Sequence, residues 1–436
     1  MTRDDLISDN LSVGENGHLY FRNHDTVELA EKYSTPLYLM DEVRLRENMR
    51  MYIRAFRDSF GPGALPIYAG KANSFKRIYE IAREEGMGID AVSAGELYTA
   101  MKAGFPLERA FFQGNNKTDW DIAFAMDLGV GYFVVDNREE LDAIARIAAG
   151  RGLRQKLLLR LTPGIDPHTY DAVATGKVDS KFGTAIETGQ AREMLEHALS
   201  LPSIDLRGLH CHVGSQVFGE DVFERSADIM LEFMDRCNRD YGLSLEILDL
   251  GGGYGVRYVK EDDYVDIPAA IARVAEHIKK VCTRLGMELP RIIMEPGRSI
   301  VADAGLTLYT VGTVKKITGY KNYVSVDGGM SDNPRYALYR SKYTVLLASR
   351  PEAKAGLLCD VVGRCCESDD VIQPKVLLPE PERGDILAVC TTGAYNYSMA
   401  SNYNRLTRPA MVMLTEDSDY LAVRRESLDD LVRNDI

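Results

Sequence analysis

Short apolar runs alternate with amphipathic segments along about the first 300 positions of the chain. Apolar residues recur at helical spacing over residues 41–57, and this run stops before Gly61-Pro62-Gly63, which is a clear break signal. Eight strand-like runs follow the break, and helical patterns separate most of them. Strand–helix alternation predicts a parallel sheet, and eight repeats favour an α/β fold whose sheet closes into a (β/α)8 TIM-type barrel.

The predicted elements can be given by residue range. The strands are 65–70, 88–92, 109–113, 131–135, 156–161, 206–213, 245–250 and 291–295. The helices between them include 95–103, 119–128, 138–149, 190–199, 223–239 and 269–285. Ahead of the barrel, the pattern predicts a short strand at 18–21 and a lead-in strand at 35–40.

The pattern changes after residue 304. Apolar runs at 306–314, 323–326, 355–362 and 385–389 are interrupted by Gly and Pro, and they follow one another without helices between them. Strands in direct succession predict an antiparallel sheet. We therefore expect a barrel domain over residues 36–303 and a C-terminal antiparallel β domain over residues 304–436, joined by residues 1–35.

Charge and composition exclude several classes of function. The 436 residues include 52 basic and 65 acidic side chains, so the net charge is −13, and no long block of Lys and Arg is present. An acidic chain without a basic block disfavours a nucleic-acid or anionic-membrane partner. Any anion that the protein binds must therefore be held by a local site.

Cysteine usage and the amino terminus indicate the compartment. The seven cysteines are odd in number and form no CxxC pair, which disfavours both a disulfide framework and a zinc knuckle. The first five residues are polar and acidic, and no apolar run approaches the ~18–20 residues that span a bilayer. We expect a soluble, unprocessed, cytoplasmic protein.

Chemically useful residues follow the predicted strands at the end where such barrels place their chemistry. They are Lys71 after the first strand, His210 and His212 in the sixth, Gly251-Gly252-Gly253 after the seventh, and Glu295 and Arg298 at the eighth. Barrels of this kind often bind phosphate with the loops after strands seven and eight. Glycines allow backbone N–H groups to approach a phosphate, and an arginine supplies a charged partner.

A lysine, a phosphate cradle and a buried carboxylate together match the needs of pyridoxal phosphate. Lys71 would bind the cofactor covalently, and Glu295 would keep its pyridine nitrogen protonated. Each residue also has an ordinary explanation, since a lysine is a surface charge about nine times in ten. A strand-end glutamate is more often an ion-pair partner, and about half of glycine runs are simple turns. The joint placement favours the cofactor.

The segment His210-Cys211-His212 raises the question of a metal site. Period-two geometry puts both histidines on one face of a strand, but the chain has only seven histidines, and no other strand end completes a ligand set. We put a metal site here at about one in ten and therefore predict that no metal is bound. His212 is better used to stack on the cofactor ring, with Ser215 as a donor to the phosphate.

These residues give the chain a resemblance to the alanine-racemase-like barrel class of pyridoxal phosphate enzymes, and within it to the diaminopimelate decarboxylases. The matching segments span nearly the whole chain in the order of the family. They are Tyr68-Ala69-Gly70-Lys71-Ala72-Asn73, His210-Cys211-His212-Val213-Gly214-Ser215-Gln216, Gly251-Gly252-Gly253-Tyr254-Gly255, Glu295-Pro296-Gly297-Arg298, Cys366-Glu367-Ser368 and Gly393-Ala394-Tyr395.

The resemblance implies roles for the cofactor residues. Lys71 corresponds to the lysine that carries the cofactor, His212 to the residue stacked on its ring, and Glu295 to the partner of the pyridine nitrogen. A racemase-like relative would carry arginine in place of Glu295, so glutamate favours decarboxylation. The implied phosphate contacts come from Ser215, Gly252, Gly253, Arg298 and Tyr395.

The resemblance also implies how a substrate with both charges at its far end is held. Glu367 would pair with the distal ammonium, because a buried charge left unpaired is costly. Cys366 would donate the proton that replaces the lost carboxylate. In this family the cysteine and the glutamate reach the site of a neighbouring subunit, which implies a homodimer with shared active sites. The distal carboxylate would be held by Arg298, Arg335 and Tyr339, with Tyr395 beside the substrate.

The implied activity is the pyridoxal phosphate-dependent decarboxylation of meso-2,6-diaminopimelate to L-lysine, the last step of lysine biosynthesis. Two alternatives remain. One is a decarboxylase of D-ornithine, D-lysine or a polyamine precursor, and the other is an inactive binding homologue. Two positions depart from the family pattern, Gly70 in place of a larger apolar residue and Asp369 in place of glycine. Asp369 adds negative charge beside the residue expected to hold the distal ammonium.

Overall fold

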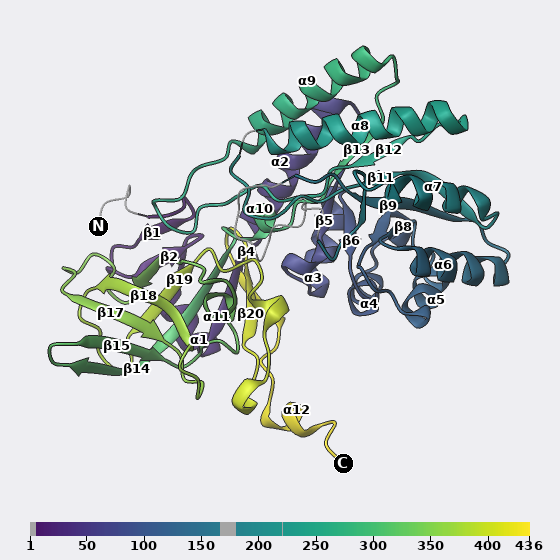
Figure 1. The fold of residues 1–436 in the computed structure, drawn as a ribbon. Helices are drawn as coiled ribbons and strands as arrows, with labels where there is room; N and C mark the ends of the chain where they lie inside the picture. The colour runs from purple at the N-terminus through teal and green to yellow at the C-terminus, as the bar shows by residue number, and fades with distance from the viewer. Residues whose placement is uncertain (1–5, 166–179, 220) are drawn as a thin grey trace. The chain divides into compact units, whose positions relative to one another are not determined.

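The computed structural model describes residues 6–165, 180–219 and 221–436 (Figure 1). The chain forms two compact units. The sheet unit contains Met1–Glu47, Val256–Asp263 and Ile300–Ile436, and the barrel unit contains Asn48–Gly255 and Tyr264–Ser299. The division into residues 36–303 and 304–436, joined by residues 1–35, stays a prediction, and residues 1–5 lie outside the described part of the chain.

Within the described residues, eight parallel strands close into the barrel. Strand β13 pairs with β5, and β8 pairs with β9, so the sheet has no open edge. The predicted (β/α)8 barrel is confirmed, and each predicted strand has its counterpart within a few residues. The strands are β5 (Leu65–Ala69), β6 (Gly88–Ala91), β7 (Ala110–Phe112), β8 (Tyr132–Val135), β9 (Gln155–Thr162), β11 (Ile204–His210), β12 (Ile247–Asp249) and β13 (Arg291–Met294). A short strand, β10 (Thr184–Ala185), pairs with β9.

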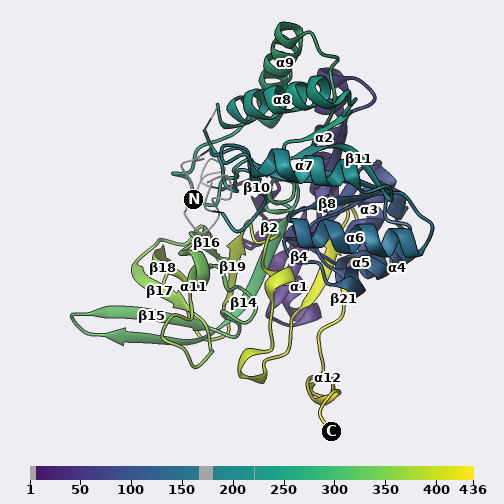
Figure 2. The same ribbon diagram turned by 45° about the vertical axis from the view of Figure 1, so that its right-hand side comes forward.

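Helices connect the barrel strands and lie around them (Figure 2). Polar side chains start several of these helices: Ser93 accepts from the N–H of residue 96, Asn137 from that of residue 140, and Asp266 from that of residue 269. The α-helices are α2 (Glu42–Phe60), α3 (Lys76–Glu85), α4 (Ala94–Lys102), α5 (Asp119–Asp127), α6 (Arg138–Gly150), α7 (Gln190–Ser200), α8 (Val222–Tyr241), α9 (Ile267–Leu285) and α10 (Arg298–Val301). Two 3-10 turns, η2 (Gly70–Ala72) and η3 (Leu107–Arg109), follow β5 and precede β7.

Apolar side chains from six barrel strands pack into one cluster that fills the lower part of the barrel. They are Ile67, Phe111, Val134, Leu158, Ile247 and Ile293, and each is at most 1% exposed. Branched and aromatic side chains suit this position because the inside of a small barrel is a packed core and not a channel. The interior of the barrel at these positions is therefore apolar.

The sheet unit is built on a large twisted sheet with the order β18-β17-β15-β14-β4-β20-β21, to which β19 and β16 are added beside β14. Most pairs are antiparallel, as predicted. Two are parallel, β4 with β20 and β15 with β17, because long connections separate the strands of each pair along the chain. The strands are β4 (Leu37–Asp41), β14 (Gly305–Ile317), β15 (Lys321–Val326), β16 (Val345–Leu347), β17 (Leu357–Val362), β18 (Val371–Leu378), β19 (Ile386–Cys390), β20 (Ala410–Leu414) and β21 (Asp419–Val423).

The predicted lead-in strand is β4, and it lies between β14 and β20 in this sheet. A separate small sheet contains β1 (Leu11–Val13), β2 (Leu19–Phe21) and β3 (His24–Asp25), in which β2 is the strand predicted at residues 18–21. The helical elements of the unit are α1 (Thr26–Tyr33), α11 (Arg335–Tyr339), α12 (Leu428–Val432), η5 (Tyr397–Met399) and η6 (Tyr403–Arg405).

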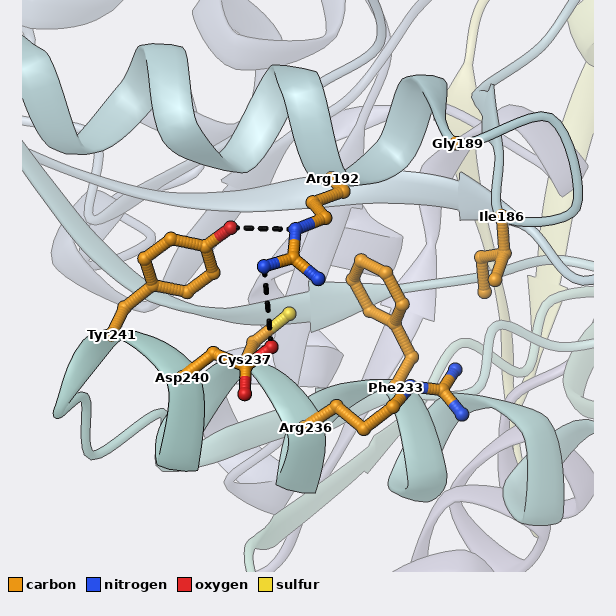
Figure 3. A pocket seen from close by; sticks show the side chains of 8 residues that line it. All are labelled: Ile186, Gly189, Arg192, Phe233, Arg236, Cys237, Asp240 and Tyr241. Atoms are coloured by element: carbon orange, nitrogen blue, oxygen red, sulfur yellow. Dashed lines mark hydrogen bonds and ion pairs between the residues drawn. The ribbon is translucent and has the colours of Figure 1, made fainter.

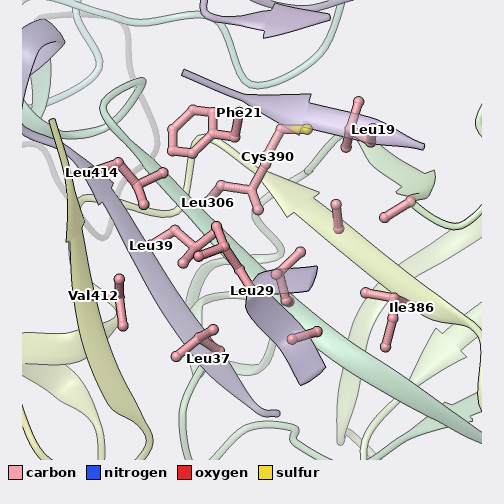
Figure 4. Packing of buried hydrophobic residues seen from close by; sticks show 14 of the residues in the cluster. Leu19, Phe21, Leu29, Leu37, Leu39, Leu306, Ile386, Cys390, Val412 and Leu414 are labelled. Atoms are coloured by element: carbon pink, nitrogen blue, oxygen red, sulfur yellow. The ribbon is translucent and has the colours of Figure 1, made fainter. Parts of the chain in front are cut away.

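Alternating leucines of β4 and β14 form the centre of the sheet unit's core (Figure 4). Leu37 and Leu39 on β4, and Leu306 and Leu308 on β14, face the same side because side chains alternate along a strand. All four are at most 1% exposed, and α1 contributes Leu29 to the same cluster. This packing joins the amino-terminal segment to the C-terminal sheet.

No helix among residues 6–165, 180–219 and 221–436 combines the length and the apolar character that a membrane crossing requires. The seven cysteines all lie within these ranges, and each is a free thiol.

Leu308→Ala is expected to lower the free energy of unfolding by about 2–5 kcal/mol, because Leu308 is fully buried and its removal leaves a cavity beside β4. Equilibrium urea unfolding measures the change. The matched control is Leu421→Ala on β21, where the leucine is 49% exposed and a change within about 0.5 kcal/mol is expected. Equal losses in the two variants would contradict this description of the core.

Candidate active site

Polar side chains from five strand ends meet inside the barrel unit, and we call them the acid cluster. The members are Asp90 on β6, Gln113 directly after β7, His210 at the end of β11, Asp249 at the end of β12 and Glu295 directly after β13. Each is at most 5% exposed. The Gln113 amide donates to Glu295 Oε1, and His210 Nε2 lies 3.4 Å from the same oxygen. The acid cluster therefore surrounds Glu295 with polar groups.

Asp249 and Glu295 differ in their tendency to ionise. Burial raises the pKa of Asp249 well above its ordinary value, and repulsion from Glu295 adds to the rise. Burial also raises the pKa of Glu295, but the positive charge of Lys71 and a hydrogen bond from Asp249 oppose that rise. The pKa of Asp249 is raised more strongly than that of Glu295, so Glu295 is the carboxyl group that ionises more readily. Burial lowers the pKa of His210 far below its ordinary value, so this imidazole is neutral.

Sequence reasoning did not select Asp90, Gln113 or Asp249. Gln113 and Asp249 stand at the carboxyl ends of apolar strands, which is the same signal that selected Glu295, whereas Asp90 lies within the predicted strand 88–92. A systematic search of all eight strand ends would have found Gln113 and Asp249.

Lys71 lies at the strand-end face of the barrel, in the turn η2 that follows β5. Its Nζ is 4.0 Å from Asp90 Oδ2, and its side chain is 40% exposed. The Ala69 N–H donates to Pro296 O at 3.0 Å, which joins the backbone before Lys71 to the backbone after Glu295. The barrel thus brings Lys71 and Glu295 to one face, where their charges interact.

The turn after β12 packs so closely against the segments after β11 and β13 that only glycine fits at positions 252 and 253. A Cβ on Gly252 would lie 2.1 Å from Glu295 O, and a Cβ on Gly253 would lie 2.2 Å from Gly214 O. Gly253 also has a φ of +131°, which other residues rarely adopt. The Val217 N–H donates to Gly253 O at 2.9 Å and holds the two turns together.

Arg298 and Ser215 meet beside these turns. Arg298 is 7% exposed, and its Nε and Nη2 donate to Ser215 Oγ at 3.2 and 3.0 Å. A guanidinium, a hydroxyl and a glycine turn at the ends of neighbouring strands are the components of an anion site.

His212 lies outside the strand that was predicted to contain it. Strand β11 ends at His210, so the expectation that both histidines lie on one strand is wrong for His212. The turn instead directs His212 Nδ1 to accept from the Gly252 N–H at 3.2 Å, which leaves the ring proton on Nε2. His210 has different neighbours, and ligand atoms of His210, Asp249 and Glu295 lie within 4.8 Å of one another.

The other predicted site residues belong to the sheet unit. Arg335 begins α11, and Tyr339 follows four positions later on the same helix face. Arg335 is 5% exposed, and its guanidinium carbon lies 4.9 Å from the ring centre of Tyr258 and 6.0 Å from that of Tyr395. Its Nη1 donates to Tyr343 Oη at 3.1 Å. Three tyrosines, of which only Tyr395 was predicted, therefore surround this cation.

The buried charge of Arg335 has no counterion within residues 6–165, 180–219 and 221–436. Among the described residues, no carboxylate forms an ion pair with Arg335, and its Nε has no hydrogen-bond partner. Aromatic rings stabilise a cation without neutralising it.

Cys366 and Glu367 lie on an exposed loop of the sheet unit, whereas the other six cysteines are buried. The Cys366 N–H donates to Asn404 Oδ1 at 2.7 Å, and Tyr403 Oη donates to Glu367 Oε1 at 2.5 Å. Sequence reasoning did not select Tyr403 or Asn404, because no local pattern links residues so far apart along the chain.

The structure accounts for both departures from the family pattern. A Cβ on Gly70 would lie 2.5 Å from Tyr79 Oη, so the buried Tyr79 ring occupies the space of a larger residue at position 70. Asp369 accepts from Arg340 Nη2 at 2.9 Å on the surface. This pair offsets the negative charge that Asp369 adds.

A small cavity of about 180 Å³ lies between α7 and α8 on the outside of the barrel (Figure 3). Arg192 crosses it, bonded to Tyr241 Oη at 2.7 Å and paired with Asp240 at 3.3 Å. No predicted site residue lines it. The lining residues are Ile186, Gly189, Arg192, Phe233, Arg236, Cys237, Asp240 and Tyr241.

The titration of Asp90 gives a pH-dependent stability. Burial, together with repulsion from Glu295, raises the pKa of Asp90 from 3.8 to about 7. Between these values the folded cofactor-free chain binds a proton that the unfolded chain releases, so its stability falls as the pH rises. The melting temperature of Asp90→Asn should therefore fall less between about pH 5 and about pH 7 than that of the wild type. Exposed Asp58→Asn is the control, and equal slopes in all three proteins would refute this assignment.

Three comparisons relate this geometry to known proteins. A family model described as the pyridoxal-binding domain of pyridoxal-dependent decarboxylases matches residues 46–302. The diaminopimelate decarboxylase of Bacillus methanolicus is 43% identical over 416 residues, which cover 95% of this chain and 96% of that protein. That of Bacillus subtilis (strain 168) is 42% identical over 422 residues, which cover 97% and 96%.

The fold agrees with a solved structure of the same kind. The diaminopimelate decarboxylase from M. jannaschii in complex with L-lysine superposes with a TM-score of 0.91 at 32% identity, covering 99% of this chain and 98% of that one. Sequence and fold agree along nearly the full length. The chain therefore belongs to the pyridoxal-dependent decarboxylases, and within them to the diaminopimelate decarboxylases.

Proposed function

We propose that the chain decarboxylates meso-2,6-diaminopimelate to L-lysine, the last step of lysine biosynthesis, with pyridoxal 5'-phosphate as its cofactor. The observation that carries the choice of substrate is the buried guanidinium of Arg335, which has no carboxylate partner among the described residues. A buried charge without a partner is costly, so the site requires a ligand with a carboxylate far from its reacting end. L-lysine bound to the M. jannaschii relative is the product of this reaction.

The barrel residues fit the cofactor. The positions of Gly252 and Gly253 leave no room for side chains. The Gly252 N–H donates to His212, so the donors offered to a phosphate are the Gly253 N–H, the Ser215 hydroxyl and the Arg298 guanidinium. Lys71 follows a strand end, where an amine can bind an aldehyde. Tyr395 of the sheet unit is assigned to the phosphate and to the substrate on the family resemblance.

When bound, the cofactor supplies an electron sink for the charge left behind by the departing carboxylate. Glu295 would keep the ring nitrogen protonated, and the charge of Lys71 and the donor from Gln113 favour the ionised form of Glu295 that this task needs. His212 is held by Gly252 with a fixed ring orientation, as required of a group that stacks on an aromatic face.

The sheet unit supplies the groups for the far end of the substrate. Arg335 and Tyr339, with Arg298, bind the distal carboxylate, and Glu367 binds the distal ammonium. Cys366 donates the proton that replaces the lost carboxylate. Cys366 and Glu367 are exposed in the single chain, which supports a homodimer in which they complete the site of the partner subunit. A cytoplasmic location remains a prediction, and the free thiols accord with a reducing compartment.

One residue argues against each of the two alternatives. A decarboxylase of D-ornithine or D-lysine would leave Arg335 without a counterion, because such substrates have no distal carboxylate. An inactive homologue would have no use for a lysine beside the acid cluster.

Arg335→Gln should raise the KM for meso-diaminopimelate by about 100-fold, because the distal carboxylate loses a buried charged partner. Any turnover of D-lysine, which has no distal carboxylate, should not fall. Carbon dioxide release from both substrates measures the effect, and Arg340→Gln, which removes a surface arginine of the same segment, is the control. If the wild type prefers D-lysine, the proposed substrate is wrong.

Lys71→Ala should abolish the absorbance band near the visible edge that the wild type acquires with pyridoxal 5'-phosphate, because no other amine is assigned to the cofactor. Absorbance after gel filtration measures this. Lys76→Ala, an exposed lysine at the start of α3, should keep the band. A wild type that never shows the band would favour the inactive homologue.

A further inference from the structure

We propose that Tyr403 and Asn404 are positioning residues that hold Cys366 and Glu367 in their working orientation. We call residues 365–370 the Cys-Glu loop. The inference rests on the proposed function, because it takes Cys366 as the proton donor and Glu367 as the partner of the distal ammonium. It extends that function to two residues whose role is to fix the shape of the loop.

Two adjacent residues of η6 form hydrogen bonds with two adjacent residues of the loop. Asn404 Oδ1 accepts from the Cys366 N–H at 2.7 Å, and Tyr403 Oη donates to Glu367 Oε1 at 2.5 Å. Both loop residues are exposed, so little apolar packing restrains them. These two hydrogen bonds therefore fix the backbone from which the Cys366 thiol projects and the direction of the Glu367 carboxylate.

The base of the Cys-Glu loop is fixed separately by a buried carboxylate. Asp370 is 4% exposed and accepts from the backbone N–H groups of Cys365 and Met330, each at 2.6 Å. A Cβ on Gly363 or Gly329 would lie 2.3 or 2.5 Å from Asp370 oxygens, so glycine is required on both sides of it. Only the tip of the loop depends on Tyr403 and Asn404.

The segment that carries the two positioning residues is itself anchored. Glu426 accepts from Asn402 Nδ2 at 2.6 Å and from the backbone N–H and Nε of Arg408 at 2.9 and 2.7 Å. Asn404 has a φ of +52°, and asparagine is one of the few residues that adopt this left-handed conformation at low cost. The turn therefore presents a rigid surface to the loop.

Each hydrogen bond predicts a different kinetic effect. A displaced thiol slows the proton transfer that follows loss of the carboxylate, so the loss of the Asn404 contact should act on kcat. A misdirected carboxylate weakens the hold on the distal ammonium, so the loss of the Tyr403 contact should act on KM.

The test compares substitutions that delete one contact each in the holoenzyme. Asn404→Gly removes the acceptor and retains the left-handed backbone, and it should lower kcat for meso-diaminopimelate by about 10- to 100-fold. Asn404→Asp retains both acceptor and backbone and should restore kcat. Tyr403→Phe should raise KM by about 10-fold with little change in kcat.

A second measurement reports on the thiol itself. The rate of alkylation by iodoacetamide reports on Cys366, because the other six cysteines are buried. Asn404→Gly should accelerate alkylation several-fold, since the released loop exposes the thiol for more of the time. The control is Arg405→Gly, which alters the neighbouring left-handed residue but no contact to the loop, and it should behave as the wild type.

The outcomes separate this inference from the function on which it rests. Cys366→Ser and Glu367→Gln with wild-type turnover would overturn the proposed roles of those residues. If these two variants are impaired while Asn404→Gly and Tyr403→Phe match the wild type, only the positioning role is overturned. A loss in Asn404→Gly that Asn404→Asp does not restore also overturns it, because the hydrogen bond would not be the cause.

Discussion

The closure of the barrel between β5 and β13 is the constraint on which the candidate site depends. The two strands pair in parallel with Met294 opposite Pro66, and the hydrogen bond from the Ala69 N–H to Pro296 O continues this pairing beyond the strand ends. A shift of register by one residue would turn every side chain to the opposite face. Because the register is fixed, Lys71 and Glu295 leave neighbouring strands toward the same face.

Both units bury charge that the described part of the chain does not fully neutralise. In the barrel unit, burial raises the pKa of Asp249 more strongly than that of Glu295, so Glu295 is the carboxyl group that ionises more readily. In the sheet unit, tyrosine rings and one hydroxyl surround Arg335, and its Nε is left unsatisfied. Such charges destabilise the empty protein and are retained where a ligand of opposite charge binds. A protonated ring nitrogen and a substrate carboxylate are the two ligands that the proposed function supplies.

The sequence predicted the barrel well because strands buried on both faces are continuous apolar runs, and Lys71 and Glu295 stand directly after two of them. Asp90 was missed because a single carboxylate inside such a run was read as part of the strand. The position of His212 was wrong because a period-two pattern cannot show where pairing stops, and β11 ends at His210. The setting of Arg335 was not predictable, since only tertiary structure brings the distant Tyr258 to it.

Tyr258 lies on the segment that connects the residues assigned to the cofactor phosphate with those assigned to the distal carboxylate of the substrate. The segment Val256–Asp263 follows the glycine turn after β12 but belongs to the sheet unit, where Thr344 N–H and Oγ1 donate to Tyr258 O at 3.1 and 2.9 Å. This anchoring fixes the ring against Arg335. The glycines assigned to the phosphate and Tyr258, which stabilises the Arg335 guanidinium, are therefore only a few positions apart in sequence. In the proposed function, Tyr258 therefore acts on substrate choice through its contact with Arg335, whereas the glycine turn a few residues earlier acts on the cofactor.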